Sequence, residues 1–296
     1  MPAPDRHAER QRLLAHMDAY LQCLRQRDFS ALKCTPGLRN TDNGVPLPLG
    51  NGSARTIRQL HEKGQYFVDV HAGQVAFWGV AEQIAGPFIY GVRLKIEGQL
   101  VAEIETLLVG NTDPYFFPQV ILTSDPAFHD IVPPEQRCDR GELIDIANLY
   151  FDAIEQNDGS LVPVRDDCLR LVNGAEDTVT DVSDMGQSEA HRALGVRQQM
   201  SEGHYGYIEA LRGRRFPLVD EERGLVIAHV LFDHPGDIGK PNGEIPFGQP
   251  NSMLAFEAFK IAGGQIQAVW AICYTVNYGM ASGWPQEEHL GILEAV

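Results

Sequence analysis

Residues 20–44 read YLQCLRQRDFSALKCTPGLRNTDNG, and residues 150–174 read YFDAIEQNDGSLVPVRDDCLRLVNG. The two stretches align without a gap at an offset of 130 residues (150 minus 20), and the matched pairs are Tyr20 and Tyr150, Asp28 and Asp158, Leu32 and Val162, Asn43 and Asn173, and Gly44 and Gly174. Further on, Leu94-Lys95-Ile96 matches Phe259-Lys260-Ile261, and a Gly-containing turn follows both. Self-similarity at a fixed offset marks a repeated structural unit. The sequence therefore predicts two copies of one unit.

Each half shows the same order of secondary-structure signals. Apolar side chains recur at helical spacing over residues 10–27 and 141–156, which predicts an amphipathic helix at the start of each half. A polar loop is expected after each helix, followed by β-rich runs. The predicted strands are Gln65 to Val70, Gln74 to Ile84, Phe88 to Ile96 and Leu100 to Val109, then Tyr205 to Ala210, Arg214 to Val219, Leu225 to Phe232, Leu254 to Ile261 and Ile266 to Val276. This order predicts an α+β fold.

The boundary between the halves is predicted near Asp139. The stretch Asn111 to Cys138 contains five prolines, which interrupt regular structure and indicate a linker. We therefore expect a first unit at residues 1–138, which includes the linker, and a second unit at residues 139–296. The Gly- and Pro-rich segment Pro235 to Pro250 predicts an inserted loop in the second unit.

The composition limits the class of protein. A length of 296 residues suits two units, and 44% hydrophobic residues predict real cores. The chain has 24 basic and 40 acidic residues, a formal charge of −16, which repels phosphate backbones and anionic membrane surfaces. We therefore expect neither a nucleic-acid partner nor a membrane partner.

The sequence also favours a cytoplasmic location. Its start is polar and lacks the apolar segment of a secretory signal, and no apolar run approaches the length that crosses a bilayer. The five cysteines are odd in number and scattered, without CxxC spacing, so neither a disulfide framework nor a zinc site is predicted. A homo-oligomer is compatible with this composition.

Several motifs of the second half resemble the NTF2-like, or SnoaL-like, superfamily. They are Cys168-Leu169-Arg170 before Asn173-Gly174, Arg214-Arg215-Phe216, Val219 to Gly224, Phe232 to Gly236, Phe259-Lys260-Ile261 and Tyr278 to Trp284. With the helix and the Arg39 to Gly44 loop of the first half, they are similar to the tandem SnoaL-like proteins of fungi and soil bacteria. The resemblance covers most of the chain and implies two tandem NTF2-like units, each a cone-shaped α+β barrel.

The resemblance also implies a range of functions. Superfamily members include polyketide cyclases, isomerases, dehydratases, epoxide hydrolases, lyases that release formaldehyde from lignin-derived aromatic dimers, and binding proteins without activity. They share a deep, mostly apolar cavity, and most use no cofactor. The resemblance therefore implies a hydrophobic small-molecule substrate and no cofactor. A shared fold does not fix the reaction.

Glu257 is the first candidate for chemistry. A four-residue turn over residues 262–265 would pair Glu257 with Trp270 and place Phe259 on the same apolar face. A carboxyl group in those surroundings is expected to have a raised pKa, which suits a general acid or base near neutral pH. Trp270 and Phe259 are then expected to contact the substrate. The structural alternative is a glutamate that pairs with a buried arginine or caps a loop.

The predicted strand Leu225 to Phe232 supplies two more catalytic candidates. Its alternation places His229 on an apolar face, with Asp233 at the end of that face. The two residues are roughly 13 Å apart along the strand, so they cannot form a dyad. His234 points the other way and is predicted to bind substrate. The alternative for each histidine is a satisfied core residue.

Four other side chains are predicted substrate contacts. Tyr150 lies on the core face of its helix, and Tyr90 lies on the apolar face of the first-half hairpin. Arg215 can neutralise an anionic or phenolate oxygen, with an ion pair to a nearby acidic residue as the alternative. Asn173 precedes a glycine, as its counterpart in the first half does, so a turn-forming role is the alternative there.

The first-half hairpin carries charges on its other face. A three-residue loop at 97–99 would pair Arg93 with Glu103 and set Glu105 opposite Gly91. Charges in such a position usually face water. This register predicts a solvated cross-strand ion pair, and a role in a pocket is the alternative.

No nucleotide, metalloprotease or serine-hydrolase motif is present, and no metal site is predicted. Acid–base chemistry by side chains alone remains. The leading hypothesis is a cofactor-independent lyase that cleaves a carbon–carbon or carbon–oxygen bond in a hydrophobic phenolic or aromatic small molecule. The alternatives are a polyketide-type cyclase, isomerase or dehydratase, and a non-catalytic small-molecule-binding protein.

Overall fold

The computed structural model describes residues 5–123, 125–176 and 194–285. The first unit consists of α1 (Arg6–Gln26), β1 (Cys34–Asp42), β2 (Val45–Pro46), α2 (Ser53–Thr56), β3 (Gln59–Asp69), β4 (Gln74–Gln83), β5 (Gly86–Glu97) and β6 (Leu100–Val109). The second consists of α4 (Arg140–Gln156), β7 (Val164–Val172), β8 (Ala175–Glu176), α6 (Val196–Ser201), β9 (Ala210–Asp220), β10 (Leu225–His234), β11 (Asn251–Ala262) and β12 (Gln265–Val276). Between them lie α3 (Pro118–Ile121), η1 (Pro126–Phe128) and η2 (Pro134–Gln136).

The two units have the same sheet topology. Their strand orders are β2-β1-β6-β5-β4-β3 and β8-β7-β12-β11-β10-β9. In each sheet the first long strand pairs in parallel with the last, β1 with β6 and β7 with β12, whereas the other neighbours are antiparallel. The predicted α+β fold of two tandem units is therefore confirmed.

The long helices begin and end on matched signals. The side chain of Asp5 caps the start of α1, and Asp139 and Glu142 form a capping box at the start of α4. Each helix ends on a residue in the left-handed conformation, Arg27 with φ 55° and Asn157 with φ 50°, again 130 residues apart. No helix in the described ranges is long and apolar enough to span a membrane.

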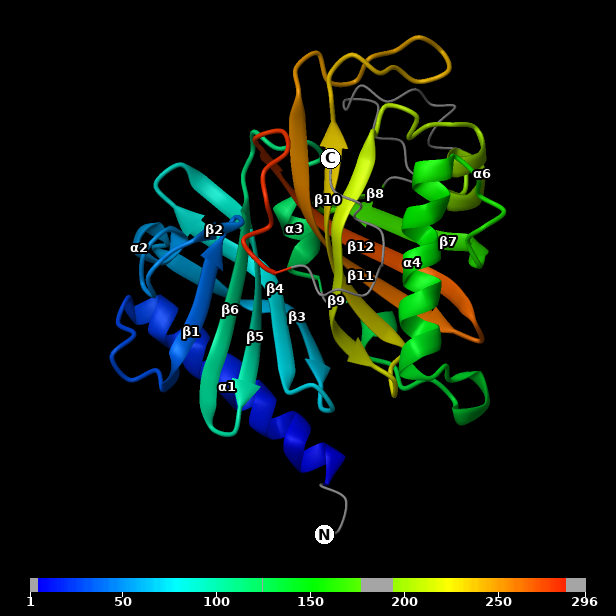
Figure 1. Ribbon diagram of the computed structural model, residues 1–296. Coiled ribbons are helices and arrows are strands. Elements are labelled where there is room, and N and C mark those ends of the chain that lie inside the picture. The colour runs from blue at the N-terminus through cyan, green and yellow to red at the C-terminus, as the bar shows by residue number, and fades with distance from the viewer. Residues whose placement is uncertain (1–4, 124, 177–193, 286–296) are drawn as a thin grey trace.

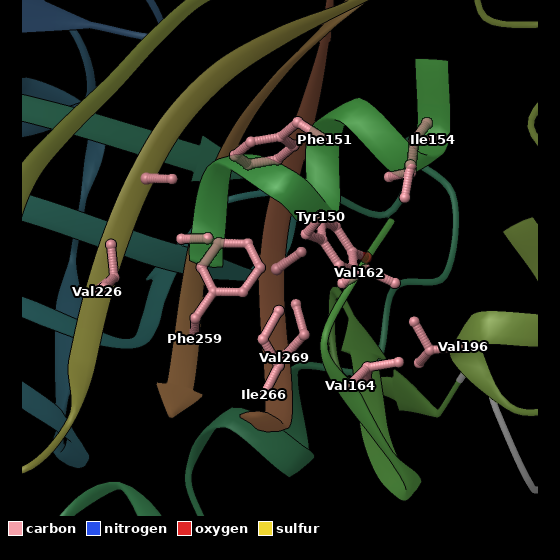
Figure 2. Close-up of a cluster of buried hydrophobic side chains, with 14 of the residues drawn as sticks. Tyr150, Phe151, Ile154, Val162, Val164, Val196, Val226, Phe259, Ile266 and Val269 are labelled. Carbon is pink, nitrogen blue, oxygen red and sulfur yellow. The ribbon is translucent and has the colours of Figure 1, made fainter. Parts of the chain in front are cut away.

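Each sheet is buried on both sides. One side, called here the helix side, packs against the unit's own long helix, α1 or α4, in an apolar cluster (Figure 2 shows the cluster around α4). The other, the interface side, packs against the opposite unit, so the two sheets meet between the two helices (Figure 1). Aromatic side chains fill the interface; they are Phe67, Trp78, Phe128, Phe256 and Trp270. A Cβ at Gly91 would clash with Cδ1 of Ile272, so a glycine lets the sheets approach.

A buried carboxylate joins the two units. Glu105 of β6 pairs with Arg93 of its own unit (Nη2 to Oε2, 3.0 Å) and with Arg215 of β9, and Nδ1 of His229 lies 3.0 Å from its Oε2. Burial would raise the pKa of Glu105, but His229, Arg215 and Arg93 outweigh burial and hold it well below its usual range. Burial also lowers the pKa of His229 to about 4, so the neutral ring donates its Nδ1 proton to Glu105.

The predicted hairpin registers were wrong in both units. A register shift between Lys260 and Ile261, and another between Lys95 and Ile96, puts a β-bulge after the first pairs of each hairpin. In the second unit the turn is as predicted, so this one extra residue turns the later side chains of one strand to the other face. Glu257 therefore pairs with Ala271 rather than Trp270. In the first unit the turn is also one residue shorter than predicted, so the pairing moves by two residues and the faces are unchanged.

The predicted solvated ion pair is wrong because the second unit covers the face on which Arg93 lies. Arg93 pairs across the strands with Glu105, and both side chains are buried at the interface. Arg93 still reaches Glu103, with Nη1 2.8 Å from Oε2. The charges that the sequence placed in water thus hold the two units together.

Three other segments differ from the sequence-based expectations. The stretches expected as polar loops after the first helix of each unit are strands, β1 and β7, because parallel pairing to β6 and β12 supplies their hydrogen bonds. Residues 205–209, expected as part of a strand, belong to a turn over residues 202–207, in which Gly203 adopts φ 70°, and to the two residues between that turn and β9. Residues 235–250, predicted as an inserted loop, join β10 to β11, whereas only residues 84–85 join the equivalent strands β4 and β5.

The two Asn-Gly pairs fasten equivalent strand ends. Asn43 and Asn173 both adopt φ 49°. The Asn43 amide bonds both main-chain groups of Leu108, and the Asn173 amide does the same at Cys273 (Oδ1 to N, 2.7 Å; Nδ2 to O, 3.1 Å). This matches the turn-forming alternative for Asn173.

Candidate functional site

The second unit contains a cavity of about 370 Å³ on the helix side of its sheet. Side chains from α4, β7, β10, β11, β12 and the 235–250 loop line it. Tyr150 and Ile154 of α4 contribute to the wall, beside the apolar cluster of Figure 2. Most of the lining is aromatic or apolar, and the volume suits a small organic molecule.

Glu257 lies on the cavity wall and is 3% exposed. Its strand neighbours on the helix side, Ala255 and Phe259, and its cross-strand partner Ala271 are all apolar. No residue in the described part of the chain hydrogen bonds its carboxyl group. Burial raises the pKa of Glu257 to about 8, against a smaller opposing effect of Arg170. The group is therefore mostly neutral at pH 7 and close to its titration point.

Arg170 of β7 brings a guanidinium group to the same wall. It is 2% exposed, its Nη2 bonds Oε1 of Gln199, and its Cζ lies 5.2 Å from the ring centre of Tyr205. The Tyr205 hydroxyl also bonds Gln199 Oε1, at 3.2 Å. Burial raises the pKa of Tyr150 well above its ordinary value despite the proximity of Arg170, so its hydroxyl stays a proton donor. The cavity thus holds a cation and two protonated acids.

An aromatic group lines the end of the cavity near the 235–250 loop. The His234 ring stacks on Tyr207, with centroids 5.5 Å apart, and lies 4.4 Å from Phe247 of the loop. Lys240 of the loop lies over the Tyr207 ring at 5.6 Å and bonds Glu244 at 3.3 Å. Burial lowers the pKa of His234 to about 4, so its ring is neutral near pH 7. The loop therefore supplies a flat, mostly apolar wall.

The structure brings three of the predicted site residues to this cavity, namely Glu257, Tyr150 and His234. Phe259 packs behind the wall, 5.1 Å from the Tyr150 ring. Asn173 lies next to it, where Nδ2 bonds the carbonyl of Pro114, a lining residue, at 2.8 Å. These five residues come from four separate segments of the second unit.

The other predicted site residues lie elsewhere. His229 and Arg215 belong to the buried ion cluster with Glu105, and Trp270 packs on Phe128 at the interface, 5.4 Å between rings. Asp233 pairs with Arg212, and Ser252 donates to it at 2.6 Å. Tyr90 lies inside the first unit, where its hydroxyl is 2.9 Å from that of Tyr20.

Sequence reasoning missed Arg170, Cys273 and the residues around Tyr207. A signal for Arg170 was present, because Leu169 and Leu171 flank it on β7 and both pack at the interface. An arginine that alternates with buried leucines must face the other side of the sheet. Cys273 could be placed only with the bulged register, which aligns it with Ala255. In the described ranges, no group of three or more His, Cys, Asp or Glu residues is arranged to hold a metal ion.

Residues 136–273, nearly all of the described second unit, match a family model described as a domain of unknown function, DUF8021. No curated protein matches the sequence significantly. Both units have one long helix packed on a mixed sheet, with the same strand order in each.

The solved structures to which this chain is similar each align with about half of it. An NTF2-like protein from Cytophaga hutchinsonii is 16% identical, with 46% of this chain and 99% of that chain covered and a TM-score of 0.29. AusH from Aspergillus nidulans is 14% identical, with 52% and 97% covered and a TM-score of 0.30. An LEH-like epoxide hydrolase from M. tuberculosis is 17% identical, with 48% and 86% covered and a TM-score of 0.30. Likenesses this remote carry nothing about the reaction.

Proposed function

We propose that the second unit binds a hydrophobic aromatic small molecule and converts it by acid–base chemistry, with Glu257 as the proton-transfer group. One observation supports this above all: a buried carboxyl group on the wall of a 370 Å³ cavity, without a hydrogen-bond partner among the described residues. A polar group that folding has removed from water and left unpaired costs stability. Such a cost is expected where a ligand completes the site.

The pKa of Glu257 suits this role. A general acid or base is most effective when its pKa lies near the working pH, and burial brings this carboxyl to about 8. Arg170 and the Tyr150 hydroxyl line the same cavity and would stabilise negative charge that develops on a substrate oxygen. The proton leaves and returns on one side chain, so the proposed reaction requires no cofactor.

The finer hypothesis is a lyase. In carbon–oxygen cleavage, ionised Glu257 takes a proton from the carbon next to the carbon–oxygen bond. The electron pair left there forms a carbon–carbon double bond as the carbon–oxygen bond breaks, and the new carboxyl group returns the proton to the leaving oxygen. In carbon–carbon cleavage, Glu257 takes an alcohol proton, the carbon–carbon bond breaks to release an aldehyde such as formaldehyde, and the carbanion receives the proton. A cyclase, isomerase or dehydratase would use the same proton transfers. A binding protein would use none.

The experiment uses 5-nitrobenzisoxazole, a small planar aromatic probe. A base takes the proton on C3, the nitrogen–oxygen bond breaks, and coloured 2-cyano-4-nitrophenolate forms, so one proton transfer is read directly. We expect turnover by the full chain to rise with pH through a midpoint near 8, because only ionised Glu257 is a base. Glu257→Gln should lower the rate by about 10²-fold or more.

The matched control is Glu97→Gln, which changes an exposed glutamate of the first unit and should leave the rate unchanged. If the probe binds to wild-type protein but Glu257→Gln turns it over equally fast, Glu257 is not the base. If the probe binds and no turnover exceeds that of free acetate at the same concentration, the binding-protein alternative stands and the enzymatic proposal falls.

A further inference from the structure

Two polar side chains face the cavity from distant points of the same sheet surface. Glu257 lies in the middle of β11, and His234 ends β10. Both are on the helix side, both line the cavity, and both are at most 3% exposed. His229, on the same strand as His234, faces the interface instead and bonds Glu105. Only His234 of these two histidines is available to a ligand.

The hydrogen bonds around His234 fix which ring nitrogen carries the proton. Nδ2 of Asn251 donates to the carbonyl of Gln249 at 3.1 Å, so the amide oxygen of Asn251 must face the other way. That oxygen lies 3.1 Å from Nδ1 of His234. Because an oxygen acceptor requires a donor, Nδ1 carries the proton. Nε2 of the neutral ring then presents a lone pair.

Nε2 of His234 makes no hydrogen bond to any residue in the described ranges. Glu257 shares this property, because its carboxyl group also makes no hydrogen bond to a residue in the described ranges. The two groups differ in kind, since Nε2 can only accept a hydrogen bond and a protonated carboxyl group can donate one. Together they specify a ligand with a donor at one end and an acceptor at the other.

The spacing of the two groups sets the shape of the ligand. His234 pairs with Asn251 across the strands, and Glu257 lies six residues further along β11 (257 minus 251). At a rise of about 3.3 Å per residue the two backbone positions are roughly 20 Å apart. The side chains bridge part of this distance. An elongated ligand is needed for the remainder.

We propose that the ligand is an elongated aromatic molecule with a hydroxyl group that donates to Nε2 of His234 and a carbonyl or ether oxygen that accepts from Glu257. Its ring next to the hydroxyl lies against the aromatic wall made by Tyr207 and Phe247. This inference rests on the proposed function, because it takes Glu257 as the group that meets the reacting oxygen. It adds His234 as the residue that selects hydroxylated substrates.

The test compares three biphenyl probes by titration calorimetry with the full chain. They are 4-acetyl-4′-hydroxybiphenyl, which has both groups, 4-acetylbiphenyl, which lacks the hydroxyl, and 4-hydroxybiphenyl, which lacks the carbonyl. We expect the first to bind about tenfold more tightly than either of the others, as one hydrogen bond at each end predicts. Equal affinities of all three would overturn the inference.

His234→Phe keeps a ring against Tyr207 and Phe247 but removes the acceptor. We expect this variant to lose the tenfold preference for 4-acetyl-4′-hydroxybiphenyl over 4-acetylbiphenyl and to bind 4-acetylbiphenyl as before. If His234 has a purely structural role, the variant will bind both probes more weakly by the same factor, and this result would contradict the assignment.

Nitrogen-15 NMR of labelled wild-type protein gives a second reading that does not depend on a variant that folds. The Nε2 signal of His234 should be that of an unprotonated imidazole nitrogen, and a protonated Nε2 would refute the argument. Failure here is distinct from failure of the proposed function. If 5-nitrobenzisoxazole is turned over through Glu257 while the three biphenyls bind equally, only the inference about the ligand falls.

Discussion

The two units share one topology, and the apolar cavity that holds Glu257 lies between the helix and the sheet of the second unit. Their hairpins have the same bulge, so β5 and β6 align with β11 and β12 at a constant offset of 165. At this alignment Tyr90 and Leu108 of the first unit take the places of Ala255 and Cys273. Cys273 lines the cavity, and Ala255 is buried on the same face of the sheet next to Glu257. Both positions hold a larger side chain in the first unit, where Tyr90 and Leu108 belong to the packed core.

The polar groups follow the same division. Val92 stands in the first unit where Glu257 stands in the second, and Asn40 stands where Arg170 stands. Tyr20 and Tyr150 occupy equivalent helix positions, but the Tyr20 hydroxyl bonds Tyr90 instead of lining a cavity. The shared pattern sets the fold of both units, and the side chains that differ between them form the site of the second.

The largest expected effect comes from making the second unit resemble the first. Ala255→Tyr places a tyrosine where Tyr90 lies and should fill the cavity next to Glu257. We expect turnover of 5-nitrobenzisoxazole to fall by about 10²-fold or more, to the level of Glu257→Gln. Ala255→Ser, a small change at the same position, should retain turnover. A fully active Ala255→Tyr protein would show that the cavity is not the site.

The interface gives the next effect, on stability. Glu105→Gln removes the carboxylate that Arg93 and Arg215 share, and it leaves two buried guanidinium groups without that counter-charge. We expect a loss of about 3–5 kcal/mol in the free energy of unfolding, measured with urea. The control is Glu103→Gln, which pairs with the same Arg93 but is partly exposed, and it should cost about 1 kcal/mol or less. Equal losses of unfolding free energy in the two variants would contradict a special role for the buried carboxylate of Glu105.

Substitutions of Tyr90 test whether the core of the first unit is fully packed. Tyr90→Ala removes a fully buried ring and should cost about 3–5 kcal/mol of unfolding free energy, as large-to-small core changes do. Tyr90→Phe keeps the ring and loses only the bond to Tyr20, so it should cost about 1 kcal/mol. If Tyr90→Ala cost no more than Tyr90→Phe in urea unfolding, the first unit would not be filled as described.

A further expected effect is a pH dependence of stability. The pKa of Glu257 is raised from 4.5 to about 8, so between these values the folded chain holds a proton that the unfolded chain releases. Stability must then fall as the pH rises, by at most about 1.4 kcal/mol per pH unit from this group. Urea unfolding from pH 5 to 8 should show Glu257→Gln gaining stability relative to the wild type. If the difference in unfolding free energy between Glu257→Gln and the wild type stays constant from pH 5 to 8, the pKa of Glu257 is ordinary.

The sequence predicted most of the fold because the repeat, the helix periodicity and the β-rich runs are local patterns. It did not predict β1 and β7, whose polar residues carry a strand only because β6 and β12 pair with them. Nor could it locate the two bulges, of which the one after Ile261 turns Trp270 away from Glu257 and the one after Ile96 helps to set Arg93 opposite Glu105. Glu257 and Tyr150 were predicted as site residues and line the cavity, although Glu257 was expected beside the wrong partner. The sequence could not show that His229 and Arg215 lie at the interface and not at the site, because the alternation of side chains along one strand does not reveal which face another unit covers.

The most direct test of the central claim is the pKa of Glu257 itself. Carbon-13 NMR of protein labelled at the glutamate side-chain carboxyl carbon would follow each glutamate through a titration from pH 3 to 10. One signal should titrate near pH 8 and should be missing from Glu257→Gln, because only a buried, unpaired carboxyl group keeps its proton so far above the ordinary value. If every glutamate signal titrates below about pH 6, or if the high signal persists in Glu257→Gln, the account of this site is wrong.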